Sequence, residues 1–478
     1  MPILSSPPGR QHAAPILLLL PLAACRAPEA APLETADLAR AVSSRDASPE
    51  ELGAALELAG LRPLAVQAPS EEARLDPARA EFWHACAWAW SPATRTARRR
   101  LEAARARAGS AGSPGPIRGV VEVRDLDDPG ANTRLMLTFD LIGLLGLGPS
   151  AAARVLAEAE TRAALGELEE AMWAARFEVD AARVRLASAR AALAELDALG
   201  REAAVELDRI EILERNGRLA EGSLAGARLA LQRLRERRGQ VALELARARE
   251  GLALAAGLVP DAPALEVPGS ETLVTWPVLD SDDGTVAAAE LLERVPRLRG
   301  LLLDYAIAEA RLRSAAAQRW PSLALGPHLF WGQPDFLVGA VAGSGLPWPG
   351  SLDGEIEAAR VEREAARERV EDGLLEVRAA QDAARERVAA ARGLLEQGAG
   401  PAAEATARLW SASRARFAVD PAGLRDWAHA LSERAKSLHA LELARAELAL
   451  ATLEVERSVG PDAEVPRLVG DPLAGVLP

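Results

Sequence analysis

Residues 165–210 read LGELEEAMWAARFEVDAARVRLASARAALAELDALGREAAVELDRI, and apolar residues recur in this stretch by alternating steps of three and four. This spacing has a period of 3.5 residues, which keeps one face of a helix against a partner helix in a left-handed coil. Alanine and glycine are frequent on that face, so neighbouring helices are expected to approach closely. The seam consists of Leu165, Leu168, Met172, Ala175, Val179, Ala182, Leu186, Ala189, Leu193, Leu196, Gly200, Ala203, Leu207 and Ile210.

The helix that carries this seam is expected to be far longer than an ordinary globular helix. Residues 150–216 contain no proline, and at 1.5 Å per residue they would span roughly 100 Å. The helix is expected to start at Gly148-Pro149-Ser150 and to stop at Asn216-Gly217, because these residue types favour those positions. A second helix, 223–257, is expected to return beside it.

The chain repeats itself at an offset of about 200 residues. The heptapeptide ALELARA occurs at 242–248 and again at 440–446. The long helix after Pro149 has a counterpart after Pro349, and the turn at 222–224 has one at 422–424. We therefore expect two copies of one unit, each built from a leading helix, two strands, a very long helix, a turn and a returning helix.

Two β-hairpins are expected between the helices. Residues 133–141 alternate apolar and mainly polar side chains and are expected to pair with 117–123, while 322–331 and 336–343 are expected to form the second hairpin. One interpretation is a small soluble sheet that covers a helix. The stripe from Leu135 to Leu141 and the residues Trp320, Trp331 and Trp348 favour a membrane sheet with interfacial aromatics, whereas Pro327 inside a strand weakens that interpretation.

Composition excludes several classes of function. A net charge of −13 argues against nucleic acid as a partner. The two cysteines, Cys25 and Cys86, leave no internal pair if Cys25 is lipidated. His84 near Cys86 is the closest approach to a metal motif, and the other histidines have no ligand spacing. We expect no metal, no cofactor and no catalytic residue, and hence no enzyme.

The N-terminal residues resemble a bacterial lipoprotein signal. An apolar core at 13–24 ends in Leu22-Ala23-Ala24-Cys25, which is similar to the lipobox, in which the cysteine receives the lipid. An ordinary cleaved signal with an incidental cysteine is the alternative. The residue after Cys25 is Arg26, and not the aspartate that is typical of lipoproteins retained in the inner membrane. The outer membrane is therefore favoured. No later apolar run is long enough for a spanning helix, so any crossing is expected to be a barrel.

In order and spacing, these features resemble the TolC-like outer-membrane efflux proteins over residues 37–460. The resemblance rests on Arg319-Trp320-Pro321-Ser322-Leu323 before a strand, on Leu346-Pro347 before the second long helix, and on the two turns 216–224 and 417–424. In two places the sequence departs from the family. The stretch 98–116 is basic and rich in proline and glycine, and Ala399-Gly400-Pro401 is expected to interrupt the second long helix.

The resemblance implies a mainly α fold with a small β part. Long helical hairpins would form a trimeric periplasmic α-barrel, and each protomer would give four strands to a shared membrane β-barrel. We expect a signal peptide at 1–24, an N-terminal segment with the first leading helices at 25–116, the first β-hairpin at 117–142, the first long helical hairpin at 149–257, a linker at 258–284, the second leading helix at 285–320, the second β-hairpin at 321–346, the second long helical hairpin at 350–460 and a C-terminal tail at 461–478.

The implied function is that of a passive homotrimeric duct in the outer membrane, lipid-anchored and extending into the periplasm. It would receive solutes from a periplasmic adaptor of the membrane-fusion type and from an inner-membrane transporter. A lipid-anchored periplasmic coiled-coil adaptor or a structural protein is the alternative. An adaptor would flank one helical hairpin with β-rich halves, and a structural coiled coil would lack strands at matching positions.

The two turns between long helices are the expected adaptor-docking tips. A small residue precedes a leucine at both, and these leucines are expected to be exposed anchors; the alternative is that the small residues only permit the helix reversal. Asp420 and Asp426 are candidates for an acidic pore gate, although Asp420 before Pro421 is also a natural turn residue. The docking candidates are Gly217, Arg218, Gly222, Ser223, Leu224, Asp420, Gly423 and Leu424.

Overall fold

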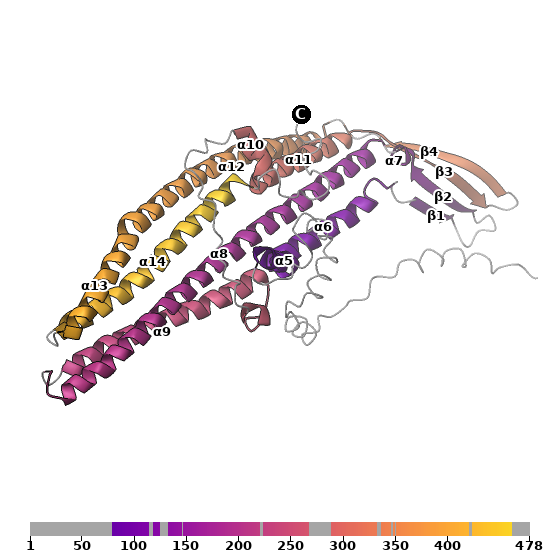
Figure 1. Cartoon of the computed structure of the whole chain (residues 1–478). Coiled ribbons are helices and arrows are strands. Elements are labelled where there is room, and N and C mark those ends of the chain that lie inside the picture. Colours follow the sequence, from indigo (N-terminus) through magenta and orange to yellow (C-terminus); the bar gives the residue numbers. More distant parts are fainter. Residues whose placement is uncertain are drawn as a thin grey trace, which may run out of the picture. The chain divides into compact units, whose positions relative to one another are not determined.

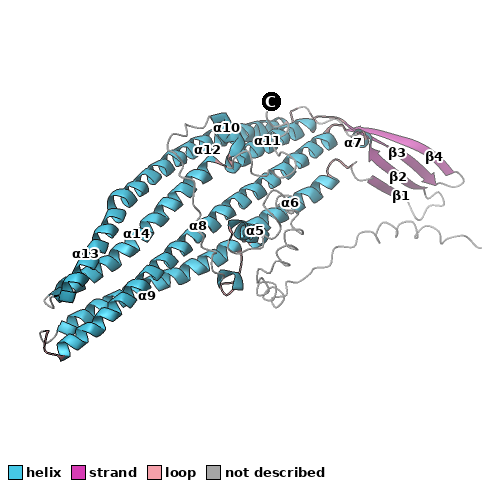
Figure 2. Cartoon of the chain, in the orientation of Figure 1, coloured by secondary structure: helices cyan, strands magenta, loops and turns pink. Residues whose placement is uncertain are grey.

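The computed structural model of this 478-residue chain describes residues 79–113, 118–124, 132–145, 147–219, 223–266, 288–331, 336–345, 348, 350–419 and 423–460. Helices dominate this part of the chain, and the strands form one sheet (Figure 2). None of the helices in the described ranges is long and apolar enough to cross a lipid bilayer.

Two long helical hairpins account for most of the described residues (Figure 1). In the first, α8 (Pro149–Arg215) turns back into α9 (Ser223–Ala256). In the second, α12 (Asp353–Gly393), the π-helical segment η4 (Leu394–Ala399) and α13 (Gly400–Val419) run on continuously and turn back into α14 (Leu424–Val459). Shorter elements precede or follow these hairpins: α5 (Ala80–Trp90), α6 (Pro92–Ser110), α7 (Leu141–Leu144), η3 (Pro263–Glu266), α10 (Ala288–Arg294) and α11 (Pro296–Ala317).

The ends of α8 form at the residues that the sequence indicated. Gly148 takes a φ of +60°, and Pro149 occupies the first helical turn, where its missing N–H costs nothing. After Arg215, Gly217 takes a φ of +69°, the left-handed conformation that commonly ends a helix. The helix has 67 residues, so its length is about 100 Å.

The α-helical winding of the second long helix is interrupted directly before Gly400-Pro401, as expected, but the helix is not broken there. Pro401 has no N–H to donate to the carbonyl four residues earlier, and its ring clashes with that carbonyl. The chain accommodates it by winding 394–399 as a π-helix, in which Gly400 N–H donates to Leu395 O. The helix therefore continues with one wider turn.

The heptad seam of α8 is buried within the chain itself. Its residues from Leu168 to Leu186 join one apolar cluster with α5, α6 and the end of α9. Its residues from Leu196 to Ile210 join a second cluster with α9, α13 and α14. The seam therefore finds its partners within one chain, because the returning helices and the N-terminal helices cover it.

A buried polar group fastens α5 to α8 inside the first cluster. His84 Nε2 lies 2.9 Å from Asp180 Oδ1, and Asp180 is almost fully buried. Burial raises the pKa of the Asp180 carboxyl, but the charge and hydrogen bond of His84 and the charges of Arg176 and Arg183 together hold it below its usual value. These partners allow a carboxylate to sit in an otherwise apolar contact.

The two hairpins of strands merge into a single antiparallel sheet. Its order is β1 (Arg118–Arg124), β2 (Asn132–Asp140), β3 (Ser322–Trp331) and β4 (Phe336–Gly345). The predicted strands are confirmed, except that Leu141 belongs to α7, because the Asp140 side chain accepts from Ile142 N–H and starts a helix. Pairing of β2 with β3 joins the two repeats, with Leu135 opposite Leu329.

Pro327 is tolerated in a central strand by a local gap in the β2–β3 ladder. Register pairs form up to Met136 opposite His328 and resume at Phe139 opposite Leu325, with none between them. At Gly326 the two strands are so close that a Cβ atom would lie 1.6 Å from the Leu137 carbonyl oxygen. Glycine is therefore required at 326.

Substituting Gly326 should break the joint between the repeats. We expect Gly326→Val to force β2 and β3 apart and to cost about 3 kcal/mol or more of unfolding free energy, since backbone rather than a flexible side chain fills the space. The matched control is Gly343→Val in β4, where a Cβ meets nothing within 4 Å. Thermal unfolding in detergent, followed by circular dichroism, measures both; equal melting temperatures would contradict the assignment.

Candidate functional site

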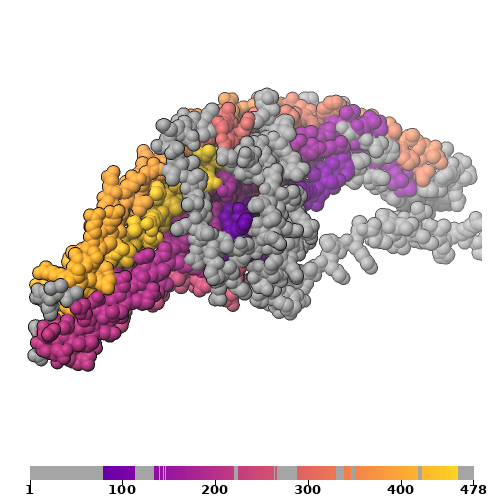
Figure 3. Space-filling model, viewed as in Figure 1, coloured from indigo at the N-terminus to yellow at the C-terminus, as the bar shows by residue number. Residues whose placement is uncertain are grey.

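The turns of the two helical hairpins are brought together in the structure. Ile210 near the end of α8, Phe417 in α13 and Trp427 in α14 belong to one buried apolar cluster. The ends of the two hairpins also lie side by side in the space-filling view (Figure 3). The two candidate tips therefore form one surface at the end of the helices opposite the sheet.

The tip residues differ in exposure. Gly217 and Arg218 are exposed, and no atom lies within 4 Å of a Cβ placed on Gly217. Leu224 is half-buried, and its N–H donates to Glu214 Oε1 at 3.3 Å, which links the two ends of the turn. Ser223 begins α9, whereas Gly222 and Asp420 lie outside the described residues.

Leu424 is not the exposed anchor that its position suggested. Only 8 % of its surface is accessible, and the preceding Gly423 is also buried. Leu424 packs with Phe417 and Trp427 in the apolar cluster of the tips. It stabilises the turn of the second hairpin, and the accessible part of the tip surface is mainly polar.

The candidate gate residue Asp426 is held in an ion pair. Its Oδ2 lies 2.8 Å from Nη1 of Arg416, so the start of α14 is tied to the end of α13. Both side chains are more than half exposed, and such pairs contribute little to stability. In this conformation the charge of Asp426 is balanced within its own hairpin.

A polar contact links α13 to α8 above the tips. Trp410 Nε1–H donates to Glu202 Oε2 at 2.9 Å, and Arg414 Nη1 lies 2.9 Å from the same oxygen. Nε of Arg414 lies 3.4 Å from Oε1 of the buried Glu206. We call this group of four side chains the α13–α8 clasp. Sequence reasoning missed it, because nothing in an Arg- and Glu-rich helix shows which charges meet across helices.

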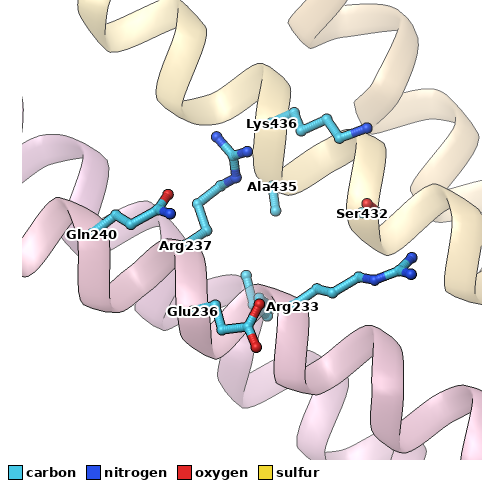
Figure 4. Close-up of a pocket in the computed structure, with 8 residues that line it drawn as sticks. Arg233, Glu236, Arg237, Gln240, Ser432, Ala435 and Lys436 are labelled. Carbon is cyan, nitrogen blue, oxygen red and sulfur yellow. The ribbon is translucent and has the colours of Figure 1, made fainter.

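A basic groove runs between α9 and α14 (Figure 4). Arg233 and Arg237 project from α9, and Lys436 lines the opposite side on α14. Lys436 pairs with Glu433 at 2.7 Å, whereas neither arginine has an ion pair within the described part of the chain. The groove lies about 15 Å from the tips along the helices. It is also lined by Leu234, Glu236, Gln240, Ser432 and Ala435.

At the sheet end, the candidate interfacial tryptophans stand at the junctions between strands and helices. Trp320 precedes β3 and Trp348 precedes α12, and both are exposed. Trp331 is the last residue of β3. Their role at a membrane surface stays a prediction.

Cys86 is fully buried, and burial raises the pKa of its thiol, so it is a packed side chain and not a reactive one. Its neighbour His84 is engaged by Asp180. No group of three or more metal-ligating side chains is found among the described residues. Cys25, the candidate lipid attachment site, lies outside them.

The clasp yields a test of the contact between hairpins. Arg414→Met keeps the aliphatic stem but leaves the buried Glu206 without its guanidinium partner, which should cost roughly 1–3 kcal/mol. We expect faster amide hydrogen exchange in α13. The control, Arg408→Met, removes a charge from the same helix that pairs only with Glu404 one turn away. Unchanged exchange in Arg414→Met would show that the clasp does not hold α13.

Comparison with known proteins identifies the fold. No family model and no curated protein matches the sequence. Among solved structures, the outer-membrane channel OprN matches with a TM-score of 0.65 and 19 % identity, covering 81 % of this chain and 91 % of that one. The outer membrane protein VceC from Vibrio cholerae gives 0.64 and 17 %, covering 82 % and 99 %.

The Campylobacter jejuni CmeC outer membrane channel gives a TM-score of 0.64 at 14 % identity, covering 80 % of this chain and 85 % of that one. These likenesses span nearly the whole of each solved chain, at identities that inform on fold alone. The predicted fold class, mainly α with long helical hairpins, a four-stranded β part and an internal repeat, is confirmed. The chain has the fold of the TolC-like outer-membrane channels.

Proposed function

We propose that this protein is one protomer of a homotrimeric channel in the outer membrane that conducts solutes passively outward. The observation that carries the proposal is the arrangement itself, a four-stranded sheet at one end of two helical hairpins about 100 Å long. The solved chains of the same fold include proteins described as outer-membrane channels. No enzymatic activity is proposed.

The edges of the protomer support self-association. In the described part of the sheet, β1 and β4 each pair on one side only, and an open edge in a membrane is unfavourable because its backbone groups lack partners. Both outer helices also expose apolar side chains, Leu243 and Leu254 on α9, Val361 and Leu375 on α12. One edge meeting the opposite edge of the next copy gives a ring when the rotation closes.

Oligomeric state and conductance test this proposal together. The purified protein in detergent should have about three protomer masses, and it should produce ion conductance in a planar bilayer because a closed ring of strands and helices encloses water. A folded, monodisperse monomer without conductance would refute the channel and would favour the alternative of a coiled-coil adaptor or structural protein.

The N-terminal anchor is part of the proposal. Lipid attachment to Cys25 rests on its lipobox-like context, and it would hold the protein at the outer membrane while the helices extend into the periplasm. We expect Cys25→Ala to abolish labelling by radioactive palmitate. Cys86→Ala, which alters only a buried thiol, should label normally. Persistent label in the Cys25 variant would exclude this anchor.

The tips are proposed to receive a periplasmic adaptor, and through it an inner-membrane transporter. Their distance from the sheet supports this, as does their exposed, mainly polar surface at Gly217 and Arg218. Asp420 and Asp426 remain the proposed gate. In a trimer each would occur three times around the axis, so separation of Asp426 from Arg416 would add negative charge to the pore mouth.

Tip variants should separate docking from assembly. Arg218→Glu and Ser223→Arg change the charge of the first turn without altering the buried Gly423 and Leu424. We expect each to reduce dye efflux from the native host several-fold while the trimer and its outer-membrane level stay normal. The matched control is Arg95→Glu on the exposed side of α6. Normal efflux in both tip variants would place the docking surface elsewhere.

A further inference from the structure

Exposed apolar side chains gather where the sheet meets the helices. Leu145 and Leu147 lie between α7 and α8 with exposures of 64 % and 47 %, Trp320 lies between α11 and β3 with 52 %, and Trp348 lies before α12 with 82 %. Three of the four strand–helix junctions therefore present a large apolar side chain to the outside. We call these four residues the apolar row.

The backbone that carries the apolar row is held by hydrogen bonds. Leu145 N–H donates to Leu141 O at 3.0 Å, Leu147 N–H to Ile142 O at 3.1 Å and Trp320 N–H to Ala317 O at 3.1 Å. Trp320 lies against the turn at Gly148, where a Cβ would be 3.4 Å from Trp320 Cβ. These hydrogen bonds fix the backbone, so the exposure of the side chains is built into the fold.

Three arginines lie on the helical side of this row. Arg105 and Arg107 occupy the last two turns of α6, and Arg154 lies in the second turn of α8. Gly112, just after α6, is so close to α8 that a Cβ there would lie 3.0 Å from Ser150 O and 3.1 Å from Arg154 Nε. The end of α6 and the start of α8 are therefore adjacent, so the three arginines lie at the same end of the helices, with Arg105 and Arg107 on different sides of α6.

The charge of these arginines is not balanced within the described residues. All three are exposed, and none has an ion pair in that part of the chain. Among the described acids close in sequence, Glu102 pairs with Arg99 at 2.6 Å, and Asp140 accepts from Ile142 N–H. Positive side chains thus gather at this end of the helices in a chain whose net charge is −13.

We infer that the three arginines bind the phosphate groups of anionic lipids at the membrane surface on the helical side of the sheet. The inference rests on the proposed function, which places the sheet in the membrane. Passing from sheet to helices, the surface changes from exposed aliphatic residues to leucine and tryptophan and then to arginine. A bilayer changes in the same order, from hydrocarbon to the interfacial zone that tryptophan prefers and then to phosphate.

The arginine side chain suits phosphate binding at a membrane surface for reasons beyond its positive charge. Its planar guanidinium donates to two phosphate oxygens at once, and its aliphatic stem lies favourably along apolar surface. The apolar row also continues into exposed sheet residues such as Val338 and Leu323. This continuity favours a lipid surface as occupant over a soluble polyanion, which would leave that row in water.

The test compares lipid selectivity of the full-length protein in two variants. The first carries Arg105→Gln, Arg107→Gln and Arg154→Gln. The matched control carries Arg218→Gln, Arg233→Gln and Arg235→Gln, which removes the same charge from exposed arginines at the tip end. Each protein is reconstituted into an equimolar mixture of phosphatidylglycerol and phosphatidylcholine, and the ratio of the two lipids retained on the protein is measured by native mass spectrometry.

We expect wild type and the control to retain phosphatidylglycerol preferentially. The first variant should lose this preference, by roughly fivefold for each arginine removed, and a triple Arg→Lys variant should retain much of it. An unchanged ratio in the glutamine variant, or no preference in wild type, would overturn the inference. So would dissociation of that variant into monomers, which would assign the arginines to a contact between protomers.

Failure of the proposed function is distinguishable from failure of this inference. If the protein does not float with vesicles of the same mixture and is a folded monomer, the membrane assignment of the sheet is wrong. If it floats and is trimeric but shows no headgroup preference, the channel stands and the lipid site does not.

Discussion

Burial of the small-residue seam of α8 is the constraint on which the rest of the structure depends. In a protein, a helix of this length gains most of its stability by packing an apolar face against other elements. Alanine and glycine are interspersed with larger residues along the seam, so α9 and α14 can lie close to α8 near the tips, while α5 and α6 cover it nearer the sheet. One continuous face thereby organises both hairpins and the N-terminal helices.

This packing also explains why the two ends of the molecule differ chemically. Near the tips, the seam brings together large aromatic side chains, Trp410 and Trp427, and Arg414 of the clasp pairs with Oε1 of the buried Glu206. At the other end the helices pass into a sheet whose apolar side chains remain exposed. The seam of α8 is buried within one chain, whereas the surface of the sheet and the exposed apolar side chains of α9 and α12 are suited to an apolar environment or to further copies.

Features governed by residues close in sequence were predictable. The seam, both β-hairpins and the glycines that flank α8 at 148 and 217 follow from local periodicity and from turn chemistry. The pairing of β2 with β3 was not predictable, because it joins segments nearly two hundred residues apart, and neither was the gap that accommodates Pro327. The burial of Leu424 and the pairing of Arg414 with Glu202 likewise depend on which helices pack against each other. The sequence does not reveal this pairing, because many arginines and glutamates of these helices have equivalent sequence contexts.

The π-helical turn at 394–399 has a consequence for the symmetry of the duplicated chain. An α-helix turns by about 100° per residue, so one residue absorbed in a wider turn rotates everything after it by about that angle. The last part of the second long helix therefore presents a different face to its neighbours than the matching part of α8 does. Two copies of one ancestral unit are thus out of phase with each other at their far ends, and a ring built from such chains would carry two distinct, alternating kinds of helical end in place of uniform ones.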